Sequence, residues 1–442
     1  MGKRFGTDGI RGEVGTEITV ELALALGRAV GHRMGGAGRT VILGRDTRRS
    51  GEMLSAALTA GLTATGTDVA DLGVVTTPCL VHASASDAYA AGIMVSASHN
   101  PAMDNGLKVV VDGRKVADEV ESELEELIDD PSAIAERPNA ALGRLRPDRG
   151  SIDAYRRHLV EAAGDAFAGL RLGIDCANGS ACAIAPELFR ALGAEVTVLF
   201  DAPDGTNIND GSGSTHPERL AETVAAAGLD LGLAFDGDAD RLIAVDERGG
   251  LVDGDAIMGI CTLDHLAAGT LRNKVLVATV MSNGGLERAV TQAGGRVVRT
   301  PVGDRHVFEA MEREDAVIGG EQSGHIIFRD LATTGDGILT GIELVRALRA
   351  AATPLSELAA RIPRLPQVMI NSAVRRAAEW REDDEFAAAV QRAAEQLGER
   401  GRVLVRPSGT EPKIRIMVEG DDADEIDRIA RELATLAEAR LS

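Results

Sequence analysis

Three aspartates occupy every second position of the segment LGLAFDGDADRLIAVDE. Asp236, Asp238 and Asp240 follow the apolar run LGLAF, and Arg241 comes directly after the last of them. Three carboxylates this close together repel one another, and burying them is costly unless a cation is bound. Hard oxygen ligands favour Mg²⁺ or Ca²⁺ over zinc. The spacing therefore predicts a Mg²⁺ site that binds a substrate phosphate, with Arg241 facing a phosphoryl oxygen.

Two other interpretations of this segment are open. With Glu247 at its twelfth position it imitates an EF-hand loop, but its sixth position is Arg241, where that loop needs a glycine for its turn. The flanking residues are also typical of strands rather than helices. The second alternative is a solvated acidic turn without a cation.

A serine follows another apolar run. AAGIMV leads into Ser96, Ser98, His99 and Pro101, and Lys108 comes ten residues after Ser98. A hydroxyl at the end of a strand can accept and donate a phosphoryl group, while lysine and Mg²⁺ stabilise the charge on its oxygens. The chain has neither the G-x-S-x-G of a serine hydrolase nor the P-loop of an ATPase. We expect phosphoryl transfer here, and an ordinary surface loop is the alternative.

A loop near the carboxyl end could bind a phosphate. In VRPSGTEPKIR, Arg406, Ser408 and Thr410 surround Pro407 and Gly409. Guanidinium, hydroxyl and loop N–H groups together make a phosphate nest. An ordinary hairpin turn would have the same proline and glycine.

A further loop, GGEQSGHI, alternates Glu321, Ser323 and His325 with glycines that let the backbone approach a ligand. Glutamate and a hydroxyl suit the recognition of sugar hydroxyls, and His325 could transfer a proton. The alternative is a purely structural loop.

Two arginine-containing loops lie early in the chain. FGTDGIRG contains Arg11, and GRDTRRSG contains Arg45 and Arg48. These arginines are either ordinary surface residues or catalytic groups beside a transferring phosphate.

Repeated elements must position these loops. Residues 39–73, 170–203 and 274–305 each read as an apolar strand, a polar loop, an amphipathic helix closing on a glycine, and a second β-branched strand. The closing glycines are Gly66, Gly193 and Gly294. This layout predicts three α/β domains with mixed, largely parallel sheets.

The last quarter differs from these units, because two helical patterns enclose the strand-like runs GRVLVR and KIRIMVE. We expect a smaller α+β domain there, preceded by a linker, RIPRLPQVMI. The predicted domains are 1–150 with the serine, 151–252 with the metal ligands, 253–366 with the sugar loop, and 367–442 with the phosphate loop.

Composition excludes several classes of function. The net charge of −21 argues against a nucleic-acid or membrane surface, which needs a basic face. Aromatic residues make up only 2%, too few for a platform of stacked bases. The loop DCANGS lacks G-x-G-x-x-G, which weakens a dinucleotide-binding interpretation. A small anionic substrate is compatible with all of this.

The cysteines and the amino terminus indicate the compartment. Cys79, Cys176, Cys182 and Cys261 are scattered without a C-x-x-C motif, so we expect free thiols rather than disulfides or zinc ligands. The start of the chain has no apolar signal core, and no run reaches the roughly 18 apolar residues that span a bilayer. We expect a cytoplasmic protein.

The loops FGTDGIRG, SASHNP with DNGLK, DGDADR, GEQSGH and RPSGTEP follow one another over essentially the whole chain. In this order they resemble the α-D-phosphohexomutase family, whose four domains surround a central cleft. FGTDGIRG and GEQSGH are most similar to the bacterial members that interconvert glucosamine 6-phosphate and glucosamine 1-phosphate, on the way to UDP-N-acetylglucosamine and cell-wall polymers.

The resemblance implies a role for each loop. Ser98 would carry the phosphate in the resting enzyme, and Ser96 would be the preceding, non-transferring serine. The aspartates would bind Mg²⁺ together with a phosphoserine oxygen. A sugar 1,6-bisphosphate would be intermediate and activator. The remaining implied site residues are Arg11, Lys108, His99 and His325 around the transferring group, and Arg241, Glu321, Ser323, Arg406, Ser408, Gly409 and Thr410 on the substrate.

Three further points stay open on the sequence alone. The proton acceptor is Lys108 or His325, and the resemblance suggests a homodimer. The same chemistry on mannose or glucose phosphate is the nearest alternative, and Gln322 in the sugar loop favours the amino sugar. A non-catalytic sugar-phosphate binding protein is the remote alternative.

Overall fold

The computed structural model describes residues 4–6, 8–135, 137–407 and 412–442. These residues divide into two compact units. The first is Met1–Met281 with Ala293–Arg361, and the second is Ser282–Gln292 with Ile362–Ser442. The described part of the first unit contains three separate sheets, and that of the second contains one.

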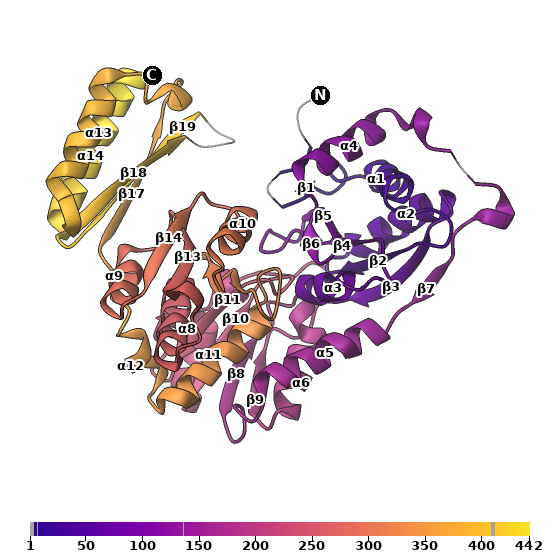
Figure 1. The fold of residues 1–442 in the computed structure, drawn as a ribbon, viewed down its shortest axis with the longest axis horizontal. Coiled ribbons are helices and arrows are strands. Elements are labelled where there is room, and N and C mark those ends of the chain that lie inside the picture. The colour runs from indigo at the N-terminus through magenta and orange to yellow at the C-terminus, as the bar shows by residue number, and fades with distance from the viewer. Residues whose placement is uncertain (1–3, 7, 136, 408–411) are drawn as a thin grey trace. The chain divides into compact units, whose positions relative to one another are not determined.

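The first sheet has the strand order β1-β5-β4-β2-β3-β7, with β6 paired to β5 (Figure 1). Strands β2, β3, β4 and β7 form parallel pairs, whereas β5 runs antiparallel to β4 and β1. The strands are β1 Ile10–Glu13, β2 Thr40–Arg45, β3 Asp68–Val74, β4 Ala91–Val95, β5 Asp104–Val111, β6 Arg114–Lys115 and β7 Leu145–Pro147. The helices are α1 Val20–Arg33, α2 Ser50–Ala64, α3 Thr77–Ser84, α4 Asp118–Asp129 and α5 Gly150–Ala163.

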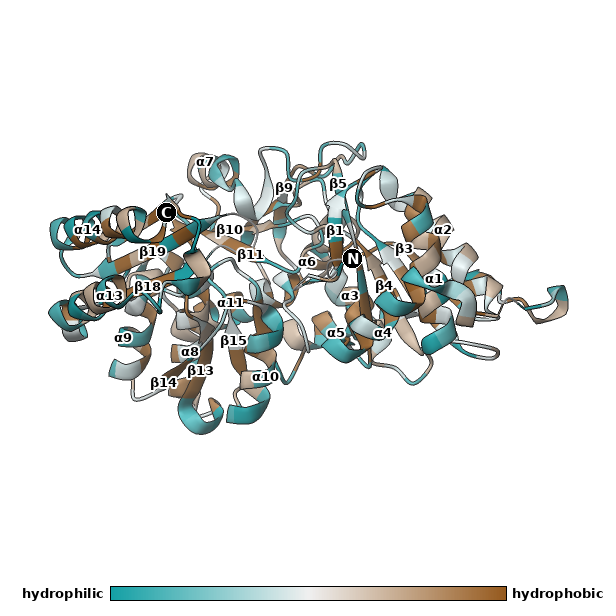
Figure 2. Ribbon diagram, turned by 90° about the horizontal axis from the view of Figure 1, so that it is seen from above, coloured by the Kyte–Doolittle hydropathy of each residue, from teal (hydrophilic) through white to brown (hydrophobic). Residues whose placement is uncertain are grey.

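The side chains of β2 point alternately to the two faces of this sheet, and both faces are buried. Val41 and Leu43 share one core with Leu26 of α1 and Leu58 of α2, because successive side chains of a strand point to opposite faces. On the other face Leu80 of α3 lies against the strands. Figure 2 shows these strands in brown and the outward helix faces in teal.

The second sheet has the order β12-β11-β10-β8-β9, and the third has β14-β13-β15-β16. The second is built from β8 Arg171–Asp175, β9 Glu195–Leu199, β10 Leu231–Phe235, β11 Leu242–Asp246 and β12 Leu251–Val252, with helices α6 Ala185–Ala191 and α7 Glu218–Ala227. The third is built from β13 Val275–Thr279, β14 Arg296–Thr300, β15 Ile318–Gly320 and β16 Ile326–Phe328, with helices α8 Gly254–Ala268, α9 Gly284–Gln292, α10 Asp304–Glu314, α11 Gly337–Ala351 and α12 Leu355–Ala359.

The three sheets share one four-strand arrangement. The orders β3-β2-β4-β5, β9-β8-β10-β11 and β14-β13-β15-β16 are equivalent. In each, two neighbouring pairs are parallel and the last is an antiparallel hairpin. The hairpin loops β4–β5, β10–β11 and β15–β16 contain Ser98, the aspartates and Glu321, respectively. One repeated position therefore supplies three of the predicted site loops.

The second unit contains an antiparallel sheet with the order β17-β19-β18. Its elements are β17 Gln367–Ala373, β18 Gly401–Pro407, β19 Lys413–Gly420, α13 Asp384–Leu397 and α14 Ala423–Leu441. Helix α9 also belongs to this unit. Short 3₁₀ turns elsewhere in the chain are Pro131–Ala133, Asn139–Ala141, Ser180–Ala183, Gly213–Thr215, Arg272–Lys274, Ala377–Glu379 and Gly398–Arg400.

These elements confirm the predicted fold class of three mixed α/β sheets and a smaller α+β domain. The linker prediction is wrong at its end, because QVMI begins strand β17. Both prolines of RIPRLP precede Gln367. The residues that follow them form a strand that pairs with β19. The domain limits at 150, 252 and 366 stay predictions.

The cysteines carry no disulfide among the described residues: Cys79, Cys176 and Cys261 are buried and Cys182 is half-buried. In the described part of the chain, no helix combines the length and the apolar character needed to cross a membrane.

Candidate active site

Ser98 lies in the loop that connects β4 to β5 and has no exposed surface. Its backbone has φ 53°, a left-handed conformation that is costly for a residue other than glycine. The hydroxyl Oγ donates to Asp236 Oδ2 at 2.5 Å. Gly237 passes close behind, since a β-carbon there would lie 2.6 Å from the Ser98 carbonyl oxygen. The serine and aspartate loops are thus packed backbone against backbone.

The three aspartates follow β10 and gather their carboxylates at one point. Asp236 and Asp238 are fully buried, Asp240 is 6% exposed, and one oxygen from each lies within 4.8 Å of the others. The backbone N–H of Arg241 donates to Asp236 Oδ1 at 3.1 Å. The Thr77 hydroxyl of α3 donates to Asp238 Oδ2 at 2.6 Å. The structure therefore brings Ser98 and the predicted metal ligands together.

The oxygens and the charges of the aspartate cluster are those expected of a cation site. Asp238 Oδ1 and Asp240 Oδ1 are buried and accept no hydrogen bond from a described residue. Burial raises the pKa of Asp236 well above its usual range, and the charges of Asp240 and Asp238 raise it further. A divalent cation would use the unpaired oxygens and offset the repulsion. An all-oxygen donor set of this kind fits Mg²⁺.

Lys108, on β5, is almost fully buried beside the same cluster. Its ammonium lies 2.7 Å from Asp238 Oδ2, 3.0 Å from Asp8 Oδ2 and 3.8 Å from Asp240 Oδ2. Asp8 also pairs with Arg11 on β1 and with Lys115 on β6. One carboxylate of the FGTDGIRG loop therefore holds three cations, two of which the sequence predicted as basic site residues.

These charges continue into the third sheet's domain. Lys115 Nζ lies 2.5 Å from Asp304 Oδ2, at the start of α10, and Asp304 lies 3.8 Å from His325 Nε2. His325 Nδ1 is 3.6 Å from Asp240 Oδ2. The side chains of six neighbouring residues thus form a closed ring, which runs through Lys108, Asp8, Lys115, Asp304, His325 and Asp240.

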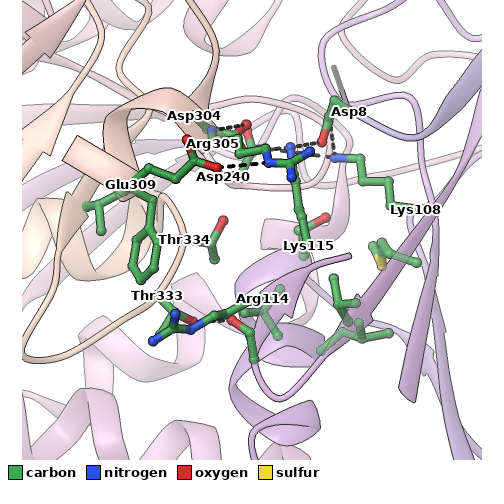
Figure 3. A pocket seen from close by; sticks show the side chains of 18 of the residues that line it. Asp8, Lys108, Arg114, Lys115, Asp240, Asp304, Arg305, Glu309, Thr333 and Thr334 are labelled. Atoms are coloured by element: carbon green, nitrogen blue, oxygen red, sulfur yellow. Dashed lines mark hydrogen bonds and ion pairs between the residues drawn. The ribbon is translucent and has the colours of Figure 1, made fainter. Parts of the chain in front are cut away.

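Much of this ring lies at one wall of a cavity of about 210 Å³ (Figure 3). Asp8, Lys108, Lys115, Asp240 and Asp304 all contribute to that wall. The rest of the lining mixes apolar side chains with charged and hydroxyl-bearing ones, among them Arg114, Arg305 and Glu309. The described residues that line it include neither Ser98 nor the predicted sugar-binding pair, so the cavity adjoins the aspartate cluster through Lys108 and Asp240 without reaching Ser98.

His325 has a defined tautomer. The backbone N–H of Gly335 donates to His325 Nε2 at 3.0 Å, which requires a lone pair on that nitrogen. The ring proton therefore lies on Nδ1, on the side of Asp240. A β-carbon at residue 335 would come within 2.6 Å of the imidazole, so only glycine allows this approach.

His99 is the imidazole nearest the serine, with Nδ1 3.4 Å from Ser98 Oγ. Burial, together with the charges of Arg241 and Arg11, lowers the pKa of His99 to about 4. The ring is therefore neutral near pH 7. Arg241 itself lies among carboxylates: burial alone would lower its pKa, but Asp240, Asp236 and Glu321 together raise it.

The loop after β15 places Glu321 and Ser323 side by side, with Ser323 Oγ donating to Glu321 Oε2 at 3.2 Å. Both side chains are half-buried. The other oxygen of Glu321 accepts from the Gly303 N–H at 3.0 Å. Gln322, expected to favour the amino sugar, instead donates to Asp253 Oδ2 at 3.3 Å, and Asp253 caps α8.

The phosphate loop belongs to the second unit. Arg406 is half-buried near the end of β18 and lies opposite Arg415 on β19. Neither guanidinium forms an ion pair or hydrogen bond with another described residue. Burial lowers the pKa of Arg406, and the charge of Arg415 lowers it further. The predicted Ser408, Gly409 and Thr410 lie outside the described residues.

The prediction for the GRDTRRSG arginines needs correction. Arg45 lies 3.4 Å from Asp71. Arg48 directs all its N–H groups at Asp46 and at backbone carbonyls of the Ser98 loop, so it is not available to a phosphate. Sequence reasoning also missed Asp8 and Asp304. Each aspartate is next to a glycine in the sequence, as Asp–Gly or Gly–Asp, and this neighbour was the only local sign of a functional loop.

Known proteins match this chain along its whole length. The phosphoglucosamine mutase of Symbiobacterium thermophilum is 51% identical and that of Moorella thermoacetica 49%, each covering at least 99% of both chains. A solved phosphoglucomutase/phosphomannomutase family protein from Burkholderia thailandensis has a TM-score of 0.84 at 27% identity, covering 100% of this chain and 98% of its own.

Models of one family match the four domains in order. The matches are phosphoglucomutase/phosphomannomutase alpha/beta/alpha domain I at residues 2–134, domain II at 153–250, domain III at 253–365 and the C-terminal domain at 369–436. The family resemblance seen in the sequence is confirmed. The chain belongs to the phosphoglucomutase/phosphomannomutase family, the phosphohexomutases, and is an isomerase-class phosphotransferase.

Proposed function

We propose that this chain interconverts glucosamine 6-phosphate and glucosamine 1-phosphate, with Ser98 as the phosphoryl carrier, and supplies the precursor of UDP-N-acetylglucosamine. The observation that carries the proposal is the direct contact of Ser98 Oγ with Asp236, at 2.5 Å, inside a buried cluster of three carboxylates. The full-length relatives named phosphoglucosamine mutase support the amino sugar as substrate.

The proposed cycle begins with phosphorylated Ser98. A free hydroxyl of the bound sugar phosphate attacks the phosphorus, a new P–O bond forms to the sugar, and the bond to Ser98 Oγ breaks. The hydroxyl proton passes to His325, or to Lys108 if that side chain is in its neutral amine form, and Ser98 Oγ takes up a proton as it leaves; both candidate acceptors lie beside Asp240. The product, a sugar 1,6-bisphosphate, turns round and returns its other phosphate to Ser98.

Asp236, Asp238 and Asp240 would hold Mg²⁺, which when bound supplies positive charge to the phosphoryl oxygens. Lys108 brings a second positive charge to the same carboxylates. His99, neutral near pH 7, lies beside Ser98 Oγ and can donate a hydrogen bond to it when the ring proton is on Nδ1. Arg241 and Glu321, close enough for their charges to interact, would orient the substrate.

In the second unit, Arg406 and Arg415 would bind the phosphate that is not reacting, together with the predicted Ser408, Gly409 and Thr410. Two guanidiniums that have no carboxylate partner among the described residues provide the charge for this. Each phosphate of the bisphosphate would occupy this site in turn. Both phosphates are of the same chemical kind, so one site can serve both.

The test measures initial rates with Mg²⁺ on glucosamine 6-phosphate, glucose 1-phosphate and mannose 1-phosphate, each primed with its bisphosphate. We expect kcat/KM to favour glucosamine phosphate by orders of magnitude, and chelation of Mg²⁺ to abolish turnover reversibly. Ser98→Ala should be folded and inactive.

Two results would contradict the proposal. Faster turnover of mannose or glucose phosphate would retain the mechanism and replace the substrate. Normal activity in Ser98→Ala would remove the serine from its role.

A further inference from the structure

Arg48 follows β2 and is buried directly beneath the loop that contains Ser98; its side chain has no exposed surface. A guanidinium has five N–H donors in a fixed planar fork. In this structure every donor has an acceptor. Nε donates to Asp46 Oδ2 at 3.0 Å. Nη1 donates to the carbonyl of Pro101 and, at 2.9 Å, to that of Asp104. Nη2 donates to the carbonyls of Ser98 at 3.0 Å and Asn100 at 2.7 Å.

Asn209 reaches the same loop from the second sheet's domain. Its Nδ2 donates to the Ser98 carbonyl at 2.9 Å and to the Asn100 carbonyl at 3.1 Å. The carbonyl oxygens of Ser98 and Asn100 therefore each accept from Arg48 and from Asn209. A carbonyl oxygen has two lone pairs, so both oxygens are saturated. The two side chains fix these carbonyls from different domains.

The amide side of Ser98 is held as well. Its N–H donates to Ser96 Oγ at 2.9 Å, and Ser96 Oγ donates to Asp46 Oδ2 at 2.6 Å. The same carboxylate oxygen accepts from Arg48 Nε. Ser96 is thus a structural link rather than a second phosphate carrier, and the polar groups on both sides of the Ser98 backbone connect to one buried ion pair.

This network explains how Ser98 keeps an unfavourable conformation. With φ 53° its backbone is in the left-handed region, which surrounding contacts must impose on a residue with a β-carbon. That conformation directs Oγ toward Asp236. Relaxation of the backbone would turn the hydroxyl away from the carboxylates, and small displacements of a reacting group lower rates strongly.

We propose that Arg48 and Asn209 are positioning residues for phosphoryl transfer, which hold the Ser98 carbonyl so that Oγ faces the aspartate cluster without touching the substrate themselves. This inference rests on the proposed function. It predicts an effect on the chemical step rather than on sugar-phosphate affinity. Lysine cannot replace Arg48, because an ammonium has three donors and no planar fork.

The experiment compares wild type with Arg48→Lys and Asn209→Ala, and uses Arg49→Lys, at the exposed neighbouring position, as the matched control. Steady-state assays give kcat and KM. Intact-mass measurements follow the loss of one phosphate from phosphorylated enzyme in a single turnover. Amide hydrogen exchange reports protection of the loop 96–104, independently of activity.

We expect Arg48→Lys to lower kcat and the single-turnover rate by roughly 100-fold, and Asn209→Ala by about 10-fold, with KM within about threefold of wild type. Both variants should lose loop protection, and Arg49→Lys should match wild type. Asn209→Ala decides the question if Arg48→Lys does not fold, because Asn209 lies on a loop.

Three outcomes overturn the inference: a change confined to KM, a loss of protection with kcat unchanged, or a loss of kcat with protection unchanged. A wild-type enzyme that turns over no sugar phosphate would instead contradict the proposed function. In that case loop protection still decides whether Arg48 and Asn209 hold Ser98.

Discussion

At the scale of single residues, many charges that the structure describes near the aspartate cluster are paired. Lys108, Arg11 and Lys115 share Asp8, and Arg48 has Asp46. Arg406 and Arg415 instead stand opposite each other on neighbouring strands, where like charges are destabilising. A bound anion would remove that repulsion, which is why we assign the non-reacting phosphate to them.

Arg406→Ala and Arg415→Ala should therefore each raise KM for the sugar phosphate. Loss of a charge-assisted hydrogen bond costs about 1.5–3 kcal/mol, or roughly 10- to 100-fold in affinity. The assay is steady-state kinetics in both directions. Arg392→Ala, an exposed arginine on α13 of the same unit, is the control and should behave as wild type. An unchanged KM in Arg415→Ala would limit the phosphate site to Arg406.

At the scale of elements, one buried carboxylate connects two helices. Asp336 caps α11 by accepting from the Leu339 N–H at 3.0 Å, and it accepts from the Tyr155 hydroxyl of α5 at 2.7 Å. Burial raises the pKa of Asp336 to about 6. The folded state therefore prefers the protonated acid, and its contribution to stability is lost as pH rises from about 4 to about 6.

Asp336→Asn keeps an acceptor for the cap but cannot ionise. Relative to wild type, its free energy of unfolding should rise with pH through that window, by roughly 3 kcal/mol at most, and then level off. Thermal unfolding of both proteins from pH 4 to 8 measures this. Asp336→Ala removes the acceptors and should be less stable than Asp336→Asn at every pH. A difference that does not vary with pH would show that Asp336 ionises normally.

Local patterns predicted the elements that carry the chemistry. The aspartate spacing and the serine after an apolar run are visible within a few residues, and strand–helix–strand periodicity predicted the repeated units. Asp8, Asn209 and Asp304 were missed because most of their partners lie far along the chain: Asn209 contacts the carbonyl of Ser98, 111 residues away. Strand β17 was missed because the prolines before it favour a linker.

At the scale of the whole molecule, helix α9 belongs to a different compact unit from the strands that flank it in the sequence. The helix lies between β13 and β14 of the third sheet, yet it belongs to the second unit. The Gly284 N–H donates to Glu419 Oε1 at 2.8 Å, and Arg288 pairs with Asp421. Residues 282–292 therefore depend for their stability on the C-terminal domain.

Hydrogen exchange can test this dependence. Ile416→Ala opens a cavity in the core of the second unit and should cost about 2–5 kcal/mol there. We expect α9 to lose protection together with β17, β18 and β19, while β13 and β14 keep theirs. Val277→Ala, a buried substitution in the third sheet, is the matched control and should spare α9. Protection of α9 that follows β13 instead would place it in the first unit.

Gly237 lies so close to Ser98 that the proposed phosphate carrier and the carboxylates beside it form one body in direct backbone contact, although they come from different sheets. In the proposed cycle one phosphate leaves this body and the other returns to it. The outward and return halves therefore use the same serine and the same carboxylates, with the sugar in opposite orientations, and the centre lowers the barrier in both directions. The direction of net conversion is then set by the free energies and concentrations of the two sugar phosphates.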